Sequence, residues 1–205
     1  MRLIFIFLFG WLACTTQSLA ATTTLLALGD SLTAGYGLDA GHAMPDVLQQ
    51  ALTKAGKDIK IVNGGISGDT AAQGAARLEW ALTPDVKGLI LELGANDALR
   101  GVAPEATDKA LRQIMDKAKA RRLPVLILGM KAPPNLGADY QAKFDALFVK
   151  LAADYGATLF PFYLEGVAAQ SGLNQPDGMH PNDQGVSVIV AKLLPVVEEF
   201  VAKLP

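Results

Sequence analysis

The amino-acid sequence predicts a single α/β domain in which a five-stranded parallel sheet lies between two layers of helices. Short apolar runs alternate with helical patterns from Thr24 to the end of the chain. The runs are mostly uncharged, which is typical of parallel strands covered on both faces. No linker, repeat or low-complexity tract interrupts the alternation, and 205 residues suit one domain with a full core.

The first element is a leader typical of a secretory signal peptide. Arg2 precedes an uncharged apolar stretch over residues 3–13, and Ser18-Leu19-Ala20 provides the small residues of a cleavage site. The stretch has about half of the roughly 20 apolar residues that a membrane span needs. We therefore expect cleavage near Ala20, a mature domain over residues 21–205, and a periplasmic or secreted protein.

Cys14 allows an alternative, a lipoprotein anchored through this residue, because Leu12-Ala13 precedes it. Trp11 disfavours the alternative, since such a site normally has a smaller aliphatic residue there. Cys14 is also the only cysteine of the chain. Cleavage after Ala20 would therefore exclude disulfides, a thiol nucleophile and a cysteine metal site.

Charge and histidine content restrict the partners. The chain has 18 Lys and Arg against 20 Asp and Glu, a net charge of -2, which gives no bulk electrostatic attraction to nucleic acid. The two histidines, His42 and His180, are far apart in the sequence, which argues against zinc. We expect no metal, cofactor, nucleic acid or membrane span, and a monomer that acts on a small molecule.

The first half of the mature chain predicts three strands and two helices. Val47, Leu48 and Ala51 share one helical face, with Gly56 as a suitable stop, and Pro84 closes the next helix. In order, the predicted elements are a strand at 25–28, a helix over 47–55, a strand at 59–62, a helix over 71–82 and a strand at 88–93.

The second half continues the alternation. Tyr140, Phe144, Leu147 and Phe148 recur at turn spacing and predict a long helix. An irregular stretch follows the last strand and ends at His180. In order, the predicted elements are a helix over 110–118, a strand at 125–128, a helix over 140–155, a strand at 158–160 and a helix over 183–201.

Polar and glycine-rich segments follow the first three strands. In open parallel sheets, ligands bind outside the carboxyl ends of the strands. Ser31, the loop over residues 64–69 and Asn96 are therefore expected at one rim.

Ser31 needs a base if it is a nucleophile, and histidine is the usual one. His180 lies three residues after Asp177, a spacing that allows the carboxylate to orient the imidazole. Each piece alone has a simpler interpretation: Gly-Asp-Ser as a turn, or Asn96-Asp97 as a helix cap. We interpret His42 as a surface histidine without a role.

Four blocks in order are more specific than any one of them. They occupy residues 29–32 (GDSL), 66–70 (ISGDT), 94–97 (GAND) and 177–182 (DGMHPN). In these blocks the chain resembles the SGNH (GDSL) hydrolase family, and more narrowly its periplasmic thioesterase, arylesterase and lysophospholipase group. The resemblance spans nearly the whole mature chain and implies a flavodoxin-like three-layer fold.

The resemblance implies a role for each matching residue. Ser31 is the expected nucleophile, His180 the base and Asp177 the acid that orients it. The oxyanion hole would consist of the backbone N–H groups of Ser31 and Gly68 and the side-chain amide of Asn96. A side chain at position 68 would obstruct the substrate, which explains the glycine. The chain has no Gly-x-Ser-x-Gly, so nucleophile-elbow hydrolases match poorly.

The substrate is less well specified. Leu99, Arg100, Gly101 and Val102 resemble the mobile loop that this group uses near its acyl site, and residues 164–176 are a second candidate wall. We expect hydrolysis of esters and thioesters of modest size, including lysophospholipids. The alternatives are a carbohydrate O-acetyl esterase of the same fold and a catalytically inactive binding module.

Overall fold

A computed structural model describes residues 22–204 as a five-stranded parallel sheet with helices on both faces. The strand order is β2-β1-β3-β4-β5, with all neighbours parallel, which confirms the predicted flavodoxin-like fold. The predicted signal peptide with Cys14, and the end residues 21 and 205 of the predicted domain, lie outside the described residues. The strands are β1 (Thr23–Gly29), β2 (Ile59–Gly65), β3 (Val86–Glu92), β4 (Val125–Leu128) and β5 (Thr158–Phe160).

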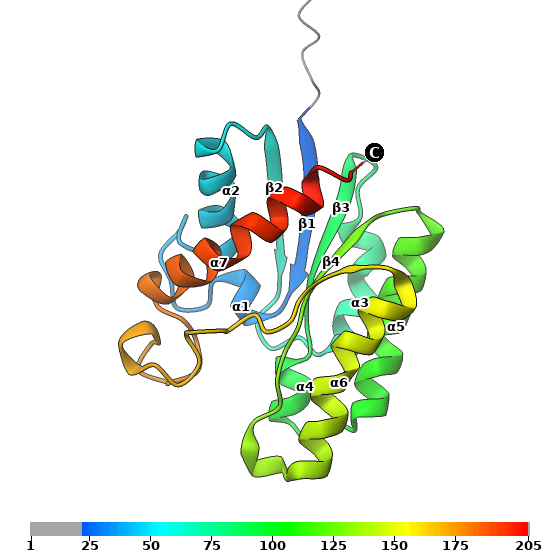
Figure 1. The fold of residues 1–205 in the computed structure, drawn as a ribbon, viewed down its shortest axis with the longest axis vertical. Helices are drawn as coiled ribbons and strands as arrows, with labels where there is room; N and C mark the ends of the chain where they lie inside the picture. Colours follow the sequence, from blue (N-terminus) through cyan, green and yellow to red (C-terminus); the bar gives the residue numbers. More distant parts are fainter. Residues whose placement is uncertain (1–21, 205) are drawn as a thin grey trace, which may run out of the picture.

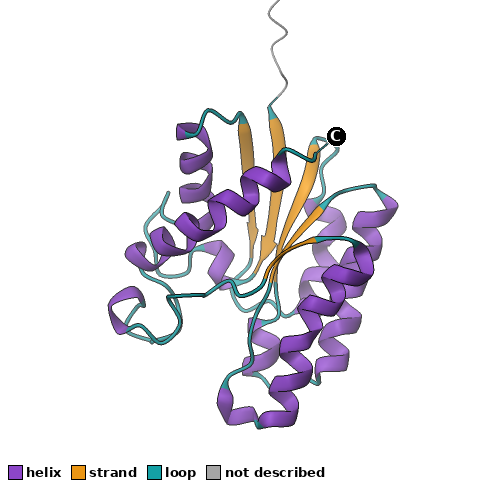
Figure 2. Ribbon diagram, viewed as in Figure 1, coloured by secondary structure: helices purple, strands orange, loops and turns teal. Residues whose placement is uncertain are grey.

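The helices form two layers (Figures 1 and 2). Helices α2 and α7 pack together on one face, and α3, α5 and α6 cover the other. The helices are α1 (Ser31–Ala34), α2 (Met44–Lys54), α3 (Ala71–Ala81), α4 (Ala95–Leu99), α5 (Pro104–Ala120), α6 (Ala138–Tyr155) and α7 (Asp183–Val201). Two short 3-10 turns, η1 (Pro134–Leu136) and η2 (Ser171–Leu173), lie in loops.

The centre of the sheet is fully buried. Leu25, Leu26, Ala27 and Leu28 of β1 are each at most 1% exposed, because side chains on both faces meet a helix layer. Burying a leucine side chain contributes about 1.5–3 kcal/mol. This burial explains why the strands are apolar runs rather than alternating patterns.

The observed ends of several elements differ from the predicted ones. Helix α2 begins at Met44 rather than residue 47, because Pro45 suits the first turn and Met44 is buried. Strand β2 continues through residues 63–65, which pair with β1. Helices α1 and α4 have four and five residues, too few to show a periodic pattern. Strands β4 and β5 and helix α7 have the predicted bounds.

Gly65, the last residue of β2, contacts α1 so closely that a side chain does not fit. A Cβ there would lie 2.2 Å from the backbone nitrogen of Ala34. We expect Gly65→Ala to lower the free energy of unfolding by about 1–3 kcal/mol, because the backbone of α1 must shift. Urea denaturation measures the change.

The matched control is Gly172→Ala, where a Cβ would meet no atom within 4 Å. This variant is expected to stay within about 0.5 kcal/mol of wild type. Equal losses in the two variants would contradict the steric explanation for Gly65.

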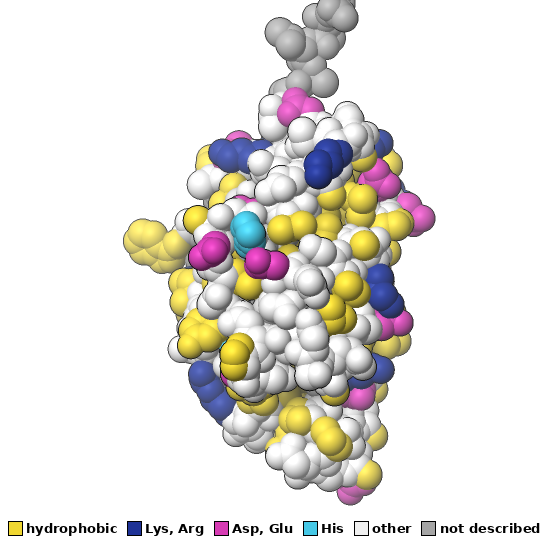
Figure 3. Space-filling model, turned by 90° about the vertical axis from the view of Figure 1, so that its left-hand side faces the viewer, with side chains coloured by type: hydrophobic (Ala, Val, Ile, Leu, Met, Phe, Trp, Pro, Cys, Tyr) yellow, Lys and Arg dark blue, Asp and Glu magenta, His cyan; other side chains and the backbone are white. Residues whose placement is uncertain are grey.

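The surface carries both signs of charge. On the face shown in Figure 3, basic and acidic side chains lie scattered among polar and apolar ones, without a continuous basic area. Across residues 22–204, no helix is both long enough and apolar enough to span a bilayer.

Candidate active site

The predicted site residues meet at the carboxyl ends of the central strands. Ser31 begins α1 directly after β1, Gly68 lies in the loop between β2 and α3, and Asn96 lies in α4 after β3. Asp177 and His180 lie in the loop before α7. Ser31, Gly68, Asn96 and His180 all line one cavity. A parallel sheet brings these loops together because its strands all end at the same edge.

His180 joins Ser31 to Asp177. Its Nε2 lies 2.9 Å from Ser31 Oγ, and its Nδ1 lies 2.6 Å from Asp177 Oδ2. The Tyr36 ring packs against the imidazole with ring centroids 4.7 Å apart. In this arrangement a carboxylate fixes Nδ1 as the donor, so Nε2 is free to accept the hydroxyl proton.

Asp177 is organised as an anion. Its Oδ1 accepts hydrogen bonds from the backbone N–H groups of His180 (3.0 Å) and Met179 (2.9 Å). These two bonds, together with the His180 side chain, lower the pKa of Asp177 to about 2. The carboxylate is therefore charged at any pH near neutrality and stabilises an imidazolium when one forms.

Donors for an oxyanion lie beside Ser31. No protein acceptor within residues 22–204 takes the backbone N–H of Ser31 or of Gly68. Asn96 Nδ2 donates to Asp30 Oδ2 at 3.0 Å, which leaves its second N–H for another acceptor. Each of the three expected oxyanion donors therefore has an N–H that no described residue accepts.

Gly68 has a positive φ of +88°, which strains any residue with a side chain. A Cβ there would have only Arg100 Nη2 within 4 Å, at 3.6 Å. The backbone conformation of this loop therefore provides a reason for the glycine that is separate from the predicted obstruction of the substrate.

The sequence matches the model of the GDSL-like Lipase/Acylhydrolase family over residues 27–188. The chain belongs to this family. The match contains all four blocks, so the predicted resemblance is confirmed.

Three relatives show how far the likeness extends. Esterase TesA of Pseudomonas aeruginosa is 43% identical over 163 residues, covering 79% of this chain and 81% of that protein. Thioesterase 1/protease 1/lysophospholipase L1 of Escherichia coli is 41% identical over 175 residues, covering 85% and 83%. The crystal structure of the psychrotrophic esterase EstA from Pseudoalteromonas sp., inhibited by monoethylphosphonate, has a TM-score of 0.83 at 30% identity, covering 88% of this chain and 100% of that one. The predicted enzyme class, a carboxylic ester hydrolase, is confirmed.

The cavity of this acylhydrolase has a volume of about 570 Å³. Of the four predicted loop residues, Leu99 lines it. Arg100 instead donates to the Gly68 carbonyl at 2.8 Å, and Gly101 and Val102 are not in the wall. The Val102 carbonyl accepts the Tyr140 hydroxyl, which directs this part of the loop toward α6.

The rest of the wall comes partly from a segment that the sequence analysis did not name. Residues 130–134, after β4, line the cavity, as do Phe162, Leu164, Ala168 and Ala169. The last three lie in the predicted second wall. The position of residues 130–134 at the carboxyl end of a strand was the available signal. A separate hollow of about 490 Å³, around Tyr155 and Phe200, contains none of the predicted site residues.

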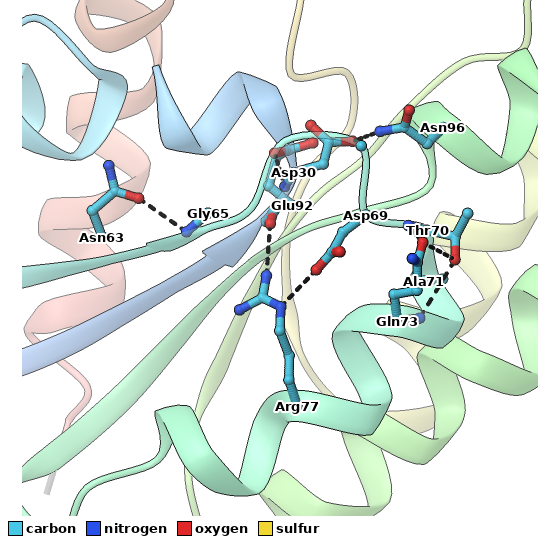
Figure 4. Close-up of polar contacts among 12 residues, drawn as sticks. Asp30, Asn63, Gly65, Asp69, Thr70, Ala71, Gln73, Arg77, Glu92 and Asn96 are labelled. Atoms are coloured by element: carbon cyan, nitrogen blue, oxygen red, sulfur yellow. Dashed lines mark hydrogen bonds and ion pairs between the residues drawn. The ribbon is translucent and has the colours of Figure 1, made fainter. Parts of the chain in front are cut away.

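Polar side chains connect the loops of the acylhydrolase site (Figure 4). Arg77 pairs with Asp69 at 2.6 Å and donates to the Gly29 carbonyl at 2.9 Å. Thr70 caps α3 in a capping box with Gln73. These contacts fix the second block against the end of β1.

The simpler interpretation of Asn96-Asp97, as a cap on the next helix, is wrong. Helix α4 has Gly94 at its N-cap and no side-chain cap, and the Asp97 carboxylate instead accepts the Ala71 N–H at the start of α3 at 2.8 Å. His42 is on the surface, where its Nδ1 lies 3.0 Å from Asp183, outside the cluster around Ser31. Among the described residues, no group of three or more His, Cys, Asp and Glu side chains is arranged to bind a metal.

Sequence reasoning missed a buried acid beneath the site. Glu92, at the end of β3, and Asp30, next to the nucleophile, are both fully buried. The signal was a carboxylate closing an otherwise apolar strand, Leu89-Ile90-Leu91-Glu92, because an acid is costly to bury without a partner.

Asn96→Ala is expected to lower kcat by about 10²–10³-fold with a smaller change in KM, because the amide would bind the oxyanion only in the transition state. Steady-state hydrolysis of p-nitrophenyl esters measures both constants. Asn135→Ala, an exposed asparagine in η1 on the same rim, is the control and is expected to behave as wild type. Equal effects on kcat and substrate affinity would argue against an oxyanion role for Asn96.

Proposed function

We propose that this acylhydrolase cleaves carboxylic esters and thioesters through an acyl-enzyme on Ser31. The observation that carries the proposal is the continuous series of short contacts from Asp177 through His180 to the hydroxyl of Ser31, which lines a cavity. A serine with a positioned base and adjacent oxyanion donors has the parts that acyl transfer requires.

The reaction follows from the geometry. Ser31 Oγ attacks the acyl carbonyl while His180 Nε2 takes the hydroxyl proton, and Asp177 stabilises the imidazolium. The oxyanion accepts hydrogen bonds from the N–H groups of Ser31 and Gly68 and from Asn96. His180 then protonates the leaving alcohol or thiol. Water, activated by His180, releases the acid and restores Ser31.

The substrate class proposed is small acyl esters and thioesters, including lysophospholipids. A cavity of about 570 Å³ that includes Leu99, Met130 and Phe162 supports an acyl chain of modest length. The names of the Pseudomonas aeruginosa and Escherichia coli relatives support the same chemistry.

A substrate panel tests this assignment: p-nitrophenyl esters from acetyl to palmitoyl, acyl-CoA and lysophosphatidylcholine. We expect the largest kcat/KM on esters and thioesters longer than acetyl. Faster removal of acetyl groups from xylan or peptidoglycan would instead identify a carbohydrate O-acetyl esterase. Failure to react with a fluorophosphonate probe would identify an inactive binding module.

We further propose that the protein is exported, that residues 1–20 are removed, and that the mature enzyme is a monomer without a nucleic-acid partner. The leader pattern around Ser18-Leu19-Ala20 supports export. The N-terminal sequence of protein from the periplasm or medium tests the cleavage site. Metabolic lipid labelling that is lost in Cys14→Ser would support the lipoprotein alternative, and light scattering measures the oligomeric state.

A further inference from the structure

Glu92 occupies an unusual place for an acid. It is the last residue of β3, the central strand, and its side chain is fully buried. Its Oε2 accepts hydrogen bonds from the Thr33 hydroxyl (2.7 Å) and the Asp30 backbone N–H (3.2 Å). Within residues 22–204, no protein donor contacts Oε1. A charged carboxylate with an unpaired oxygen in this position would be strongly unfavourable.

The Glu92 carboxyl lies within hydrogen-bonding reach of the Asp30 carboxyl, which is equally buried (Figure 4). Two carboxyl groups in contact do not both ionise, so the pair shares a proton. Asp30 is the better anion, because its Oδ1 accepts the Leu32 N–H at 3.0 Å and its Oδ2 accepts Asn96 Nδ2 at 3.0 Å.

The energetics of the pair assign the proton to Glu92. Burial, followed by the negative charge of Asp30, raises the pKa of Glu92 well above its usual range. Burial also raises the pKa of Asp30, but its hydrogen bonds to Leu32 and Asn96 oppose the rise. With the proton on Glu92 Oε1, the oxygen that no donor among the described residues contacts becomes a donor itself, and the Asp30 carboxylate is the neighbouring acceptor.

We propose that Glu92 is a positioning residue: as a neutral acid it donates a hydrogen bond to the Asp30 carboxylate, and Asp30 in turn orients the Asn96 amide that binds the oxyanion. This series of hydrogen bonds runs from Glu92, at the buried end of β3, through Asp30 to Asn96 at the cavity. It provides Asn96 with a fixed acceptor on one side, so that its second N–H faces the reacting carbonyl.

Other residues pack around the pair. Tyr163 is buried nearby, where its hydroxyl lies 3.5 Å from the Leu32 carbonyl, and burial raises the pKa of this hydroxyl well above its usual range. A positive charge on His180, formed when it takes the Ser31 proton, lowers the pKa of Asp30 and favours its anion. A Cβ on Gly29 would lie 2.0 Å from Thr33 Oγ1 and 2.6 Å from Glu92 Oε2, so the glycine of the first block makes room for these contacts.

Two substitutions separate the donor from the charge. Glu92→Gln retains a donor in place of the Oε1 proton and an acceptor in place of Oε2, and is expected to keep kcat within about threefold of wild type. Glu92→Leu retains volume but removes the donor, and is expected to lower kcat by about 10–100-fold with KM nearly unchanged. Equal losses in the Gln and Leu variants, or wild-type kcat in the Leu variant, would overturn the proposal.

A double-mutant cycle tests whether Glu92 acts through Asn96. In the Asn96→Ala background, Glu92→Leu is expected to change kcat by less than about twofold, because the group that it positions is already absent. Full additivity of the two losses would overturn the proposal while leaving the acyl-enzyme mechanism intact. Ser31 labelling by a fluorophosphonate, measured on each variant, reports separately on that mechanism.

Two further measurements distinguish positioning from loss of stability. Leu151→Ala removes a fully buried side chain from α6 and is expected to lower stability without lowering kcat. Infrared spectroscopy at neutral pH should show the carbonyl band of a protonated carboxyl in wild type that disappears in Glu92→Gln. Absence of that band in wild type would overturn the proposal even if Glu92→Leu does not fold.

Discussion

Ser31→Ala is expected to lower kcat for ester hydrolysis to near background, a loss on the order of 10⁶-fold if the site behaves as serine-protease triads do. The change removes the oxygen that lies 2.9 Å from His180 Nε2 and leaves nothing to form the acyl-enzyme. The fold should persist, because Ser31 is only partly buried and its backbone remains in α1. Steady-state kinetics and thermal unfolding measure the two quantities.

Ser187→Ala is the matched control, since this serine lies on the exposed side of α7 and its hydroxyl donates to the Asp183 carbonyl. Its kcat and its reaction with a fluorophosphonate are expected to equal those of wild type. Turnover by Ser31→Ala close to that of wild type would show that another group is the nucleophile.

Asp177→Asn is expected to lower kcat by about 10⁴-fold, the loss seen when the carboxylate of a serine-protease triad becomes an amide. An amide N–H facing His180 Nδ1 favours the tautomer that carries its proton on Nε2. That tautomer is unable to accept the proton of Ser31. The asparagine Oδ1 still accepts the N–H groups of Met179 and His180, so the turn should keep its shape.

The chain provides a control in its other His–Asp pair. Asp183→Asn makes the same change beside His42 on the surface and is expected to leave kcat unchanged. Retention of more than about a tenth of wild-type kcat in Asp177→Asn would contradict the assigned role of Asp177.

The stability of the Asp177 turn should depend on pH in a defined direction. The pKa of this carboxyl is about 2 in the folded protein, below the ordinary value of 3.8, so ionisation favours the folded state. The contribution is complete above the unfolded pKa and is lost as the pH falls toward 2. The difference in unfolding free energy between wild type and Asp177→Asn should therefore shrink as the pH falls from about 4 to about 2.

Local patterns were sufficient for the sheet and the longer helices. The apolar runs at Val125–Leu128 and Thr158–Phe160 define β4 and β5, and the helix Asp183–Val201 has the predicted bounds. These elements are predictable because burial on both faces requires an unbroken apolar run, and helix caps are local signals. The added residues of β2 and the short helices α1 and α4 depend on pairing with distant segments, which a local pattern does not record.

For the site, the resemblance of the four blocks predicted Ser31, Gly68, Asn96, Asp177 and His180, and the structure brings Ser31, Gly68, Asn96 and His180 to one cavity, with Asp177 bonded to His180. Three features were not predicted. Residues 130–134 line the cavity, Gly101 and Val102 do not line it, and Glu92 contacts Asp30. Each depends on which side chains meet across strands and loops that are far apart in the chain.

The sequence by itself determined the order of strands and helices along the chain, which follows from periodicity. It also determined the family and the candidate groups for acyl transfer, which follow from the resemblance of the four blocks. Only the tertiary structure decided that the buried acids Glu92 and Asp30 lie next to each other. Glu92 and Asp30 are 62 positions apart in the chain, yet the Asp30 N–H bonds the Glu92 carboxyl because β1 and β3 are neighbours in the sheet. Strand order in the sheet, rather than distance along the chain, places the pair beneath Asn96.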